Sequence, residues 1–216
     1  MSEVKLNILP SEVENSRSPT PEVLTINTES NVVKQEKIEP LPLYDEDYYM
    51  LSQVMPEFLD PLPNPRINNL IKRLKVTMKQ FNGLGLSSNQ CGVQERLFII
   101  GADDFQLACI NPKVIKTSEE VKREGEGCLS FPGLNLKVDR PEWIVAEFTD
   151  ENGERKQMKM EGVTARCFMH ELDHMNGIKF TQRVGPVTLQ MAKQKQEKLK
   201  KKVMRTMKNL GVKGRK

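Results

Sequence analysis

Apolar side chains recur at helical spacing in three stretches of the chain. Between residues 66 and 81 they follow the i, i+3, i+4, i+7 rhythm of an amphipathic helix. Residues 162–176 predict a second helix, with Gly177 as its C-cap. An apolar stripe from Leu189 to Leu210, otherwise surrounded by lysines, predicts a third helix with a narrow apolar face.

Shorter apolar runs between these helices are typical of strands. RLFII (96–100) and LACI (107–110) predict two of them. WIVAEF (143–148) and RKQMKM (155–160) predict a hairpin, with Asn152-Gly153 in its turn. The order of elements predicts an α+β fold in which antiparallel strands pack around the second helix, which carries an HExxH motif. An amphipathic helix precedes this core and a basic C-terminal helix follows it.

Composition divides the chain into three parts. Residues 1–40 contain no aromatic residue and no glycine, so they bury too little apolar surface to order themselves. We expect them to form a disordered acidic arm, or an extended segment that packs on the domain or on a partner. Residues 41–182 are expected to form the main folded domain and residues 183–216 the basic helix. Residues 1–60 carry 4 basic and 12 acidic side chains, whereas residues 190–216 carry 11 basic and 1 acidic.

Several classes of protein are excluded by the same features. No apolar run reaches the ~20 residues of a membrane-spanning helix. The N-terminus has no secretory pattern, and its acidity argues against a mitochondrial transit peptide. The four cysteines include no CxxC pair and are too few for a disulfide scaffold. We therefore expect a cytoplasmic protein.

The motif HELDH (170–174) is the strongest chemical signal. His170 and His174 are the only two histidines of the chain. On a helix, residues i and i+4 share one face with Cβ atoms ~6 Å apart, so both imidazoles can bind one metal ion. Glu171 lies beside that face, where a general base is needed. The alternative is a chance histidine pair, but a buried pair without a partner would be costly.

A third metal ligand must come from upstream of this motif. The metzincin pattern HExxHxxGxxH would place a histidine where this chain has Phe180, and the only acidic residue beyond Gly177 is Glu197. A soft cysteine donor is the best candidate. Cys128 lies in EGEGCLSFPG (124–133), a segment whose glycines predict an irregular loop or bulged strand. The alternative for Cys128 is a small core residue, a role that suits the other cysteines better, with Cys167 a candidate pocket wall.

A third segment, GLGLSSNQ (83–90), follows the first predicted helix. Its glycines allow the backbone to approach a ligand closely, and Gln90 could donate a proton to a developing oxyanion. The alternative is an ordinary tight turn. The segment is not a dinucleotide-binding fingerprint, because it follows a helix rather than a strand.

The segments GLGLSSNQ, EGCLS (126–130) and HELDH together resemble the peptide deformylase family in order and spacing. One departure is Ser87-Ser88, where the family has two alanines. The resemblance implies that Cys128, His170 and His174 bind one divalent metal ion with water as fourth ligand.

The same resemblance implies the roles of the surrounding residues. Glu171 would take the proton of the attacking water and pass it to the departing amine. Gln90 and the backbone N–H of Leu129 would bind the oxyanion of the tetrahedral intermediate. The backbone around Gly85 and Gly127 would pair with the substrate in strand fashion.

Leu84 and Cys167 would line the pocket for a methionine side chain. The implied substrates are formyl-methionyl nascent peptides, from which formate is released. The implied metal is Fe²⁺, with Zn²⁺, Ni²⁺ or Co²⁺ also compatible with the ligands.

Two further hypotheses concern residues outside the metal site. The first is that Glu126 and Arg140 form an ion pair that braces the Cys128 loop. The second is that residues 189–216 dock on ribosomal RNA.

Two other functions compete with this interpretation. A zinc endopeptidase shares HExxH but needs a third ligand downstream, which this chain lacks. A basic-tailed RNA-binding protein with a structural metal would need four protein ligands, and only three converge here. For the basic helix, a solvated surface is the alternative to an RNA contact. Neither a membrane nor DNA is expected as a partner.

Overall fold

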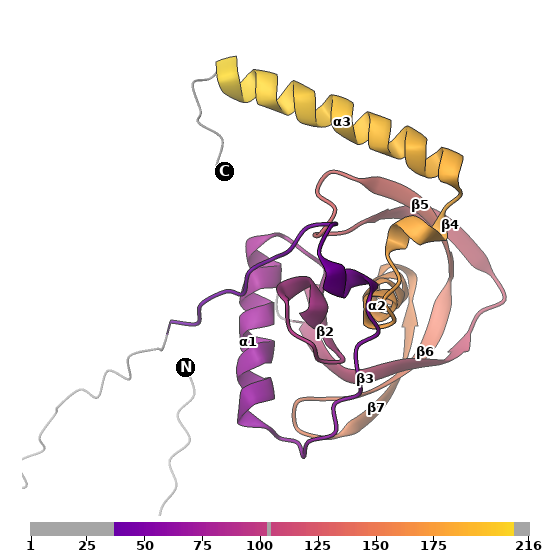
Figure 1. Ribbon diagram of the computed structural model, residues 1–216. Coiled ribbons are helices and arrows are strands. Elements are labelled where there is room, and N and C mark those ends of the chain that lie inside the picture. The colour runs from indigo at the N-terminus through magenta and orange to yellow at the C-terminus, as the bar shows by residue number, and fades with distance from the viewer. Residues whose placement is uncertain (1–36, 103–104, 210–216) are drawn as a thin grey trace, which may run out of the picture. The chain divides into compact units, whose positions relative to one another are not determined.

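The computed structural model describes residues 37–102 and 105–209 (Figure 1). All but the last four residues of the predicted N-terminal arm therefore lie outside the described residues. The elements, in chain order, are η1 (Tyr49–Ser52), α1 (Pro65–Gln80), β1 (Gly85–Ser87), η2 (Ser88–Cys91), β2 (Leu97–Ala102), β3 (Phe105–Thr117), β4 (Val121–Gly127), β5 (Asn135–Pro141), β6 (Trp143–Thr149), β7 (Arg155–Glu161), α2 (Gly162–Met175), η3 (Phe180–Arg183) and α3 (Pro186–Asn209).

Helix α1 begins and ends where its local sequence requires. The side chain of Asn64 accepts hydrogen bonds from the backbone N–H groups of Arg66 and Ile67, and Pro65 occupies the first turn. After the last turn, Asn82 takes a left-handed backbone conformation with φ of 52°. The predicted span of 66–81 thus agrees with the structure to within one residue.

Five antiparallel strands form one sheet in the order β1-β2-β3-β6-β7. In β2, Leu97 and Ile99 pack with α1, while Phe98 and Ile100 pack with α2. Because side chains alternate along a strand, β2 contributes to a core on each of its faces. Figure 1 accordingly shows the β2 ribbon between α1 and α2.

Helix α2 is the central element, which confirms the predicted fold class. Its Phe168 is fully buried and meets the ring of Phe98 edge-to-face, with 5.1 Å between ring centroids. The ring of Phe148 of β6 is a second neighbour of Phe168, with 6.4 Å between the two centroids. Gly177 follows the helix with φ of 68°, the left-handed conformation that ends many helices.

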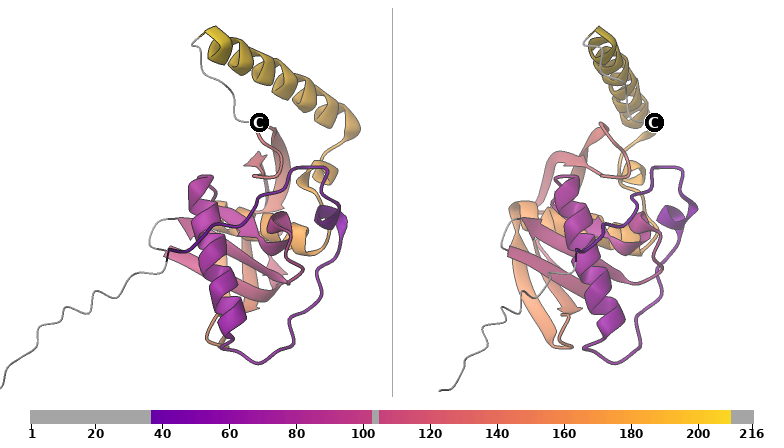
Figure 2. Two further views of the ribbon diagram at one scale, coloured as in Figure 1. Left: turned by 60° about the vertical axis from the view of Figure 1, so that its left-hand side comes forward. Right: turned by 90° about the vertical axis from the view of Figure 1, so that its left-hand side faces the viewer.

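Strands β4 and β5 form a separate two-stranded sheet, and α3 packs against its β5 strand. Figure 2 shows α3 at the end of the domain where this hairpin lies. Only the first turns of α3 pack on the domain, through Leu189, Ala192 and the buried Gln196. Leu199 and Val203, farther along the same apolar stripe, are 51% and 44% exposed.

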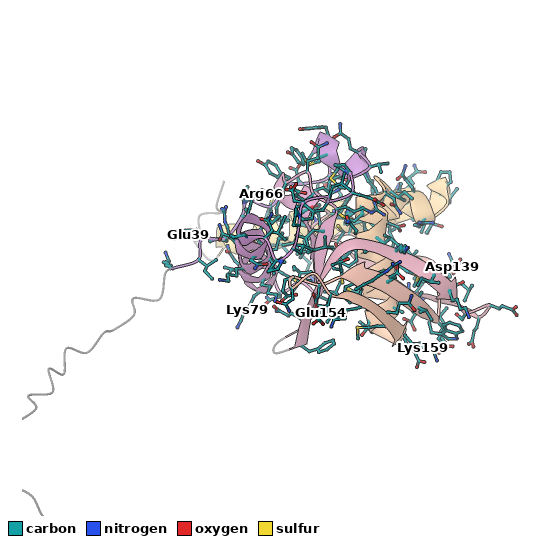
Figure 3. The ribbon with its side chains drawn as sticks, turned by 90° about the horizontal axis from the view of Figure 1, so that it is seen from below. Glu39, Arg66, Lys79, Asp139, Glu154 and Lys159 are labelled. Carbon is teal, nitrogen blue, oxygen red and sulfur yellow. The ribbon has the colours of Figure 1, made fainter. Side chains whose placement is uncertain are left out.

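The surface of the domain is rich in charged side chains. Figure 3 labels Arg66, Lys79, Glu154 and Lys159 among the charged residues, and all four are exposed. Among residues 37–102 and 105–209, no helix has the length and apolarity that crossing a bilayer requires.

Candidate metal centre

One thiol and two imidazoles meet at the end of the β4–β5 hairpin. Strand β4 ends at Gly127, and Cys128 begins a turn in which its carbonyl accepts a hydrogen bond from the N–H of Phe131. His170 and His174 are one turn apart on α2 and are 7% and 1% exposed. The Sγ atom of Cys128 lies 3.3 Å from Nε2 of His174, and the three candidate ligand atoms lie within 4.8 Å of one another.

This geometry suits a single metal ion. A tetrahedral ion bound through sulfur at ~2.3 Å and nitrogen at ~2.1 Å separates those ligand atoms by roughly 3.5 Å. The observed separation of Cys128 Sγ and His174 Nε2 is close to that value. Thiolate and imidazole are also the donors that Zn²⁺, Fe²⁺ and related ions accept. The group can therefore hold one metal ion.

A buried carboxylate orients one of the imidazoles. Oε2 of Glu126 lies 3.1 Å from Nδ1 of His170, so the Nδ1–H donates to Glu126 and Nε2 keeps its lone pair for an ion. Arg140 donates two hydrogen bonds to the same carboxylate, at 2.9 and 3.0 Å. The predicted Glu126–Arg140 ion pair is therefore present. Burial alone would raise the pKa of Glu126, but the hydrogen bonds from His170 and Arg140 outweigh it and hold the pKa at about 2.

Glu171 lies between the two histidines in sequence and is 3% exposed. Burial raises its pKa to about 7. Within the described part of the chain, its Oε2 has no hydrogen-bond partner. The backbone of Gly85 presses against this carboxylate: a Cβ atom on residue 85 would lie 2.4 Å from Glu171 Oε1 and 2.8 Å from Cys167 Sγ. Only glycine allows this approach of β1 to α2.

Gln90 approaches the same centre from η2. Its Nε2 lies 3.1 Å from Ser130 Oγ and 3.5 Å from Cys128 Sγ, and the side chain is buried. Cys167 donates its thiol proton to the carbonyl of Leu84 at 3.2 Å. These contacts bring the GLGLSSNQ segment, the EGCLS segment and the HELDH helix together.

A pocket of about 670 Å³ opens onto this centre. That volume is typical of small-molecule and peptide side-chain sites. His174 is not among its lining residues. The predicted residues that line the pocket are Leu84, Gly85, Gln90, Gly127, Cys128, Leu129, Cys167, His170 and Glu171.

Comparison with known proteins identifies this arrangement. The family model of polypeptide deformylase matches residues 44–190. The chain belongs to the peptide deformylase family. The peptide deformylase of Finegoldia magna is 40% identical over 121 residues, which cover 55% of this chain and 75% of that protein. That of Roseiflexus castenholzii is 35% identical over 140 residues, covering 57% and 76%.

Solved deformylases have the same fold. The Synechococcus elongatus enzyme, crystallised with actinonin, superposes with a TM-score of 0.69 at 33% identity, covering 73% of this chain and 86% of that one. The Legionella pneumophila deformylase gives 0.69 at 30% identity, covering 77% and 98%. This chain is thus a metal-dependent amidohydrolase with peptide deformylase activity, and its family implies formylated nascent peptides as substrates.

The deformylase site also contains charged residues that the sequence did not reveal. Asp173, a variable position of HELDH, accepts hydrogen bonds from Arg140 at 2.7 Å and from Arg183 at 2.9 Å. Arg166 donates to Glu126 at 2.8 Å. Helix α2 is apolar on more than one side, so a charged residue in it is expected to be buried and to need a partner. That was the one sequence signal that could have pointed to Arg166 and Asp173.

Proposed function

We propose that Cys128, His170 and His174 hold the metal ion of this deformylase and that Glu171 moves the proton during hydrolysis. The observation that carries this proposal is the meeting of Cys128 Sγ with His174 Nε2 at 3.3 Å, beside a buried carboxylate. A divalent ion bound there would supply a Lewis acid that lowers the pKa of water to ~7.

Glu171 is suited to proton transfer by its surroundings. Burial raises the pKa of Glu171 to about 7, so its carboxylate is a much stronger base than that of an exposed glutamate. At that pKa the protonated carboxyl group can also donate its proton near neutral pH. Glu171 takes a proton from the attacking water and later donates it to the amine nitrogen that leaves the formyl group.

We propose two donors that bind the oxygen of the formyl group as negative charge develops on it. One is the Nε2–H of Gln90, which already lies near Cys128, and the other is the backbone N–H of Leu129. Removing one such donor typically costs ~10²–10³ in kcat. Leu129 contributes through its backbone, so its side chain can vary without loss of this donor.

The substrate peptide is proposed to lie between β1 and β4. Among the described residues, β1 is at the edge of the five-stranded sheet and β4 pairs with β5 alone, so both strands have backbone groups available for an added strand. Gly85 and Gly127 keep this space free of side chains, and Leu84 and Cys167 flank the methionine pocket.

The proposed native metal is Fe²⁺, and Zn²⁺, Ni²⁺ and Co²⁺ suit the same donors. The test is formate release from formyl-methionyl peptides by protein loaded anaerobically with Fe²⁺ or Ni²⁺. Glu171→Gln should bind the metal equally well and be almost inactive. Equal turnover by that variant would remove Glu171 from the mechanism, and activity that survives Cys128→Ala with full metal content would remove the proposed ligand set.

Residues 189–216 are proposed to bind ribosomal RNA, which would place a cytoplasmic enzyme near emerging chains. Helix α3 carries eight Lys or Arg residues and one Glu, and beyond Gln196 the residues through Met207 are exposed. Affinity for ribosomes should fall steeply with salt and should be lost on truncation after residue 188. A weak salt dependence, or binding by the truncated protein, would leave α3 as a solvated helix.

A further inference from the structure

Ser87 is a hydroxyl in a completely buried position beside the active site. It links β1 to η2 and has no exposed surface. The family pattern that the chain resembles has alanine here, so the hydroxyl is a feature of this chain rather than of the shared chemistry. Burying a hydroxyl is unfavourable unless it forms hydrogen bonds, so Ser87 needs hydrogen-bond partners inside the protein.

The partners of Ser87 include the side-chain oxygen of Gln90. Oε1 of Gln90 accepts a hydrogen bond from the backbone N–H of Ser87 at 3.0 Å and lies 2.9 Å from Ser87 Oγ. An amide has its oxygen and nitrogen on opposite branches, so fixing Oε1 against Ser87 directs Nε2 toward Ser130 and Cys128. Ser87 thereby determines which way the proposed oxyanion donor points.

Asn89 extends this contact to the metal-binding helix. Ser87 Oγ lies 2.8 Å from Asn89 Oδ1, and Asn89 donates through Nδ2 to the carbonyl of His174 at 2.9 Å. The side chains of Ser87, Asn89 and Gln90 are all buried. Residue 87 therefore links the two side chains: its backbone N–H donates to Gln90 Oε1, and its hydroxyl, which carries a single proton, lies within hydrogen-bond distance of both Gln90 Oε1 and Asn89 Oδ1. Through Asn89 this link reaches the backbone of His174.

We propose that Ser87 is a positioning residue, which through its contacts with Gln90 Oε1 and Asn89 Oδ1 holds the Gln90 carboxamide in register with the metal-binding helix. This inference rests on the proposed role of Gln90 as an oxyanion donor. Ser87→Ala leaves the backbone N–H as the sole link from residue 87 to Oε1, so the carboxamide gains freedom to rotate away from the reacting oxygen.

The test is a double-mutant cycle measured by formate release from a formyl-methionyl peptide, with Ni²⁺-loaded protein. Ser87→Ala should lower kcat about tenfold, less than the ~10²-fold expected when the donor itself is removed by Gln90→Ala, and KM should stay within about twofold. The double variant should be no slower than Gln90→Ala alone, because the positioning role has the hydroxyl affect kcat through Gln90 and not through its neighbour Glu171.

The matched control is Ser88→Ala. Ser88 is equally buried, but its hydroxyl donates to the carbonyl of Glu95, away from Gln90. The Ser88→Ala variant should therefore keep the wild-type kcat. A role of Ser87 in stability alone would lower the unfolding midpoint of Ser87→Ala and leave its kcat unchanged.

Each failure identifies what is wrong. If Gln90→Ala is slow but Ser87→Ala keeps kcat within about twofold of wild type, the inference about Ser87 fails and the role of Gln90 stands. If the losses of the two single variants multiply in the double variant, Ser87 acts independently of Gln90 and the inference is again overturned. If Gln90→Ala keeps wild-type kcat, the proposed oxyanion donor is wrong, and the positioning role falls with it.

Discussion

Gly85→Ala should inactivate the enzyme without unfolding it, because the added methyl group would enter the space of the catalytic carboxylate. The Cβ atom would lie 2.4 Å from Glu171 Oε1 and 2.8 Å from Cys167 Sγ. Non-bonded carbon contacts are comfortable at about 3.5 Å. The strand or the carboxylate must therefore move by roughly 1 Å.

The size of the effect follows from the sensitivity of proton transfer to position. A displacement of ~1 Å in a reacting group can cost ~10²-fold in rate, which corresponds to about 2.7 kcal/mol in transition-state stabilisation. We expect kcat for formate release from a formyl-methionyl peptide to fall by about that factor, and bound metal to stay near one equivalent per chain, because none of the three ligands is touched.

The matched control is Gly185→Ala, in the loop before α3. A Cβ atom there meets nothing within 4 Å, and the residue is not among the glycines with positive φ. Its kcat should equal that of the wild type. A Gly85→Ala enzyme with kcat within about twofold of that control would refute the argument that residue 85 must be glycine to leave room for Glu171.

Three further substitutions test other parts of the structure. Glu126→Ala removes the partner of His170 and Arg140, so metal affinity should fall about 10–100-fold, measured by competition with a chelator; unchanged affinity would exclude its orienting role. Glu171→Gln should lower kcat by at least ~10²-fold at unchanged metal content, since the amide cannot accept the proton. Phe168→Ala should lower the free energy of unfolding by about 3–5 kcal/mol in a denaturant titration. Phe105→Ala, at a 58% exposed position, should change it little, and equal effects of the two phenylalanine variants would contradict the packing described for Phe168.

The sequence by itself determined the parts of this protein that depend on local spacing. The apolar rhythm of α1 and its Asn64 cap are set within a few residues, and the i, i+4 spacing places His170 and His174 on one face of any helix that contains them. The three motifs in register were enough to predict the family, and the order of the predicted elements was enough to predict the α+β fold; both are confirmed.

Only the tertiary structure decided which distant groups meet. Cys128 reaches His174 because the β4–β5 hairpin ends beside α2, and Asp173 becomes a shared acceptor because Arg140 and Arg183 converge on it from separate elements. Likewise, the stripe of α3 does not show that Gln196 is buried against Pro132 while Leu199 stays exposed. Helical periodicity specifies neighbours within one turn, whereas contacts across 30 or more residues depend on how the whole chain packs, which no local pattern encodes.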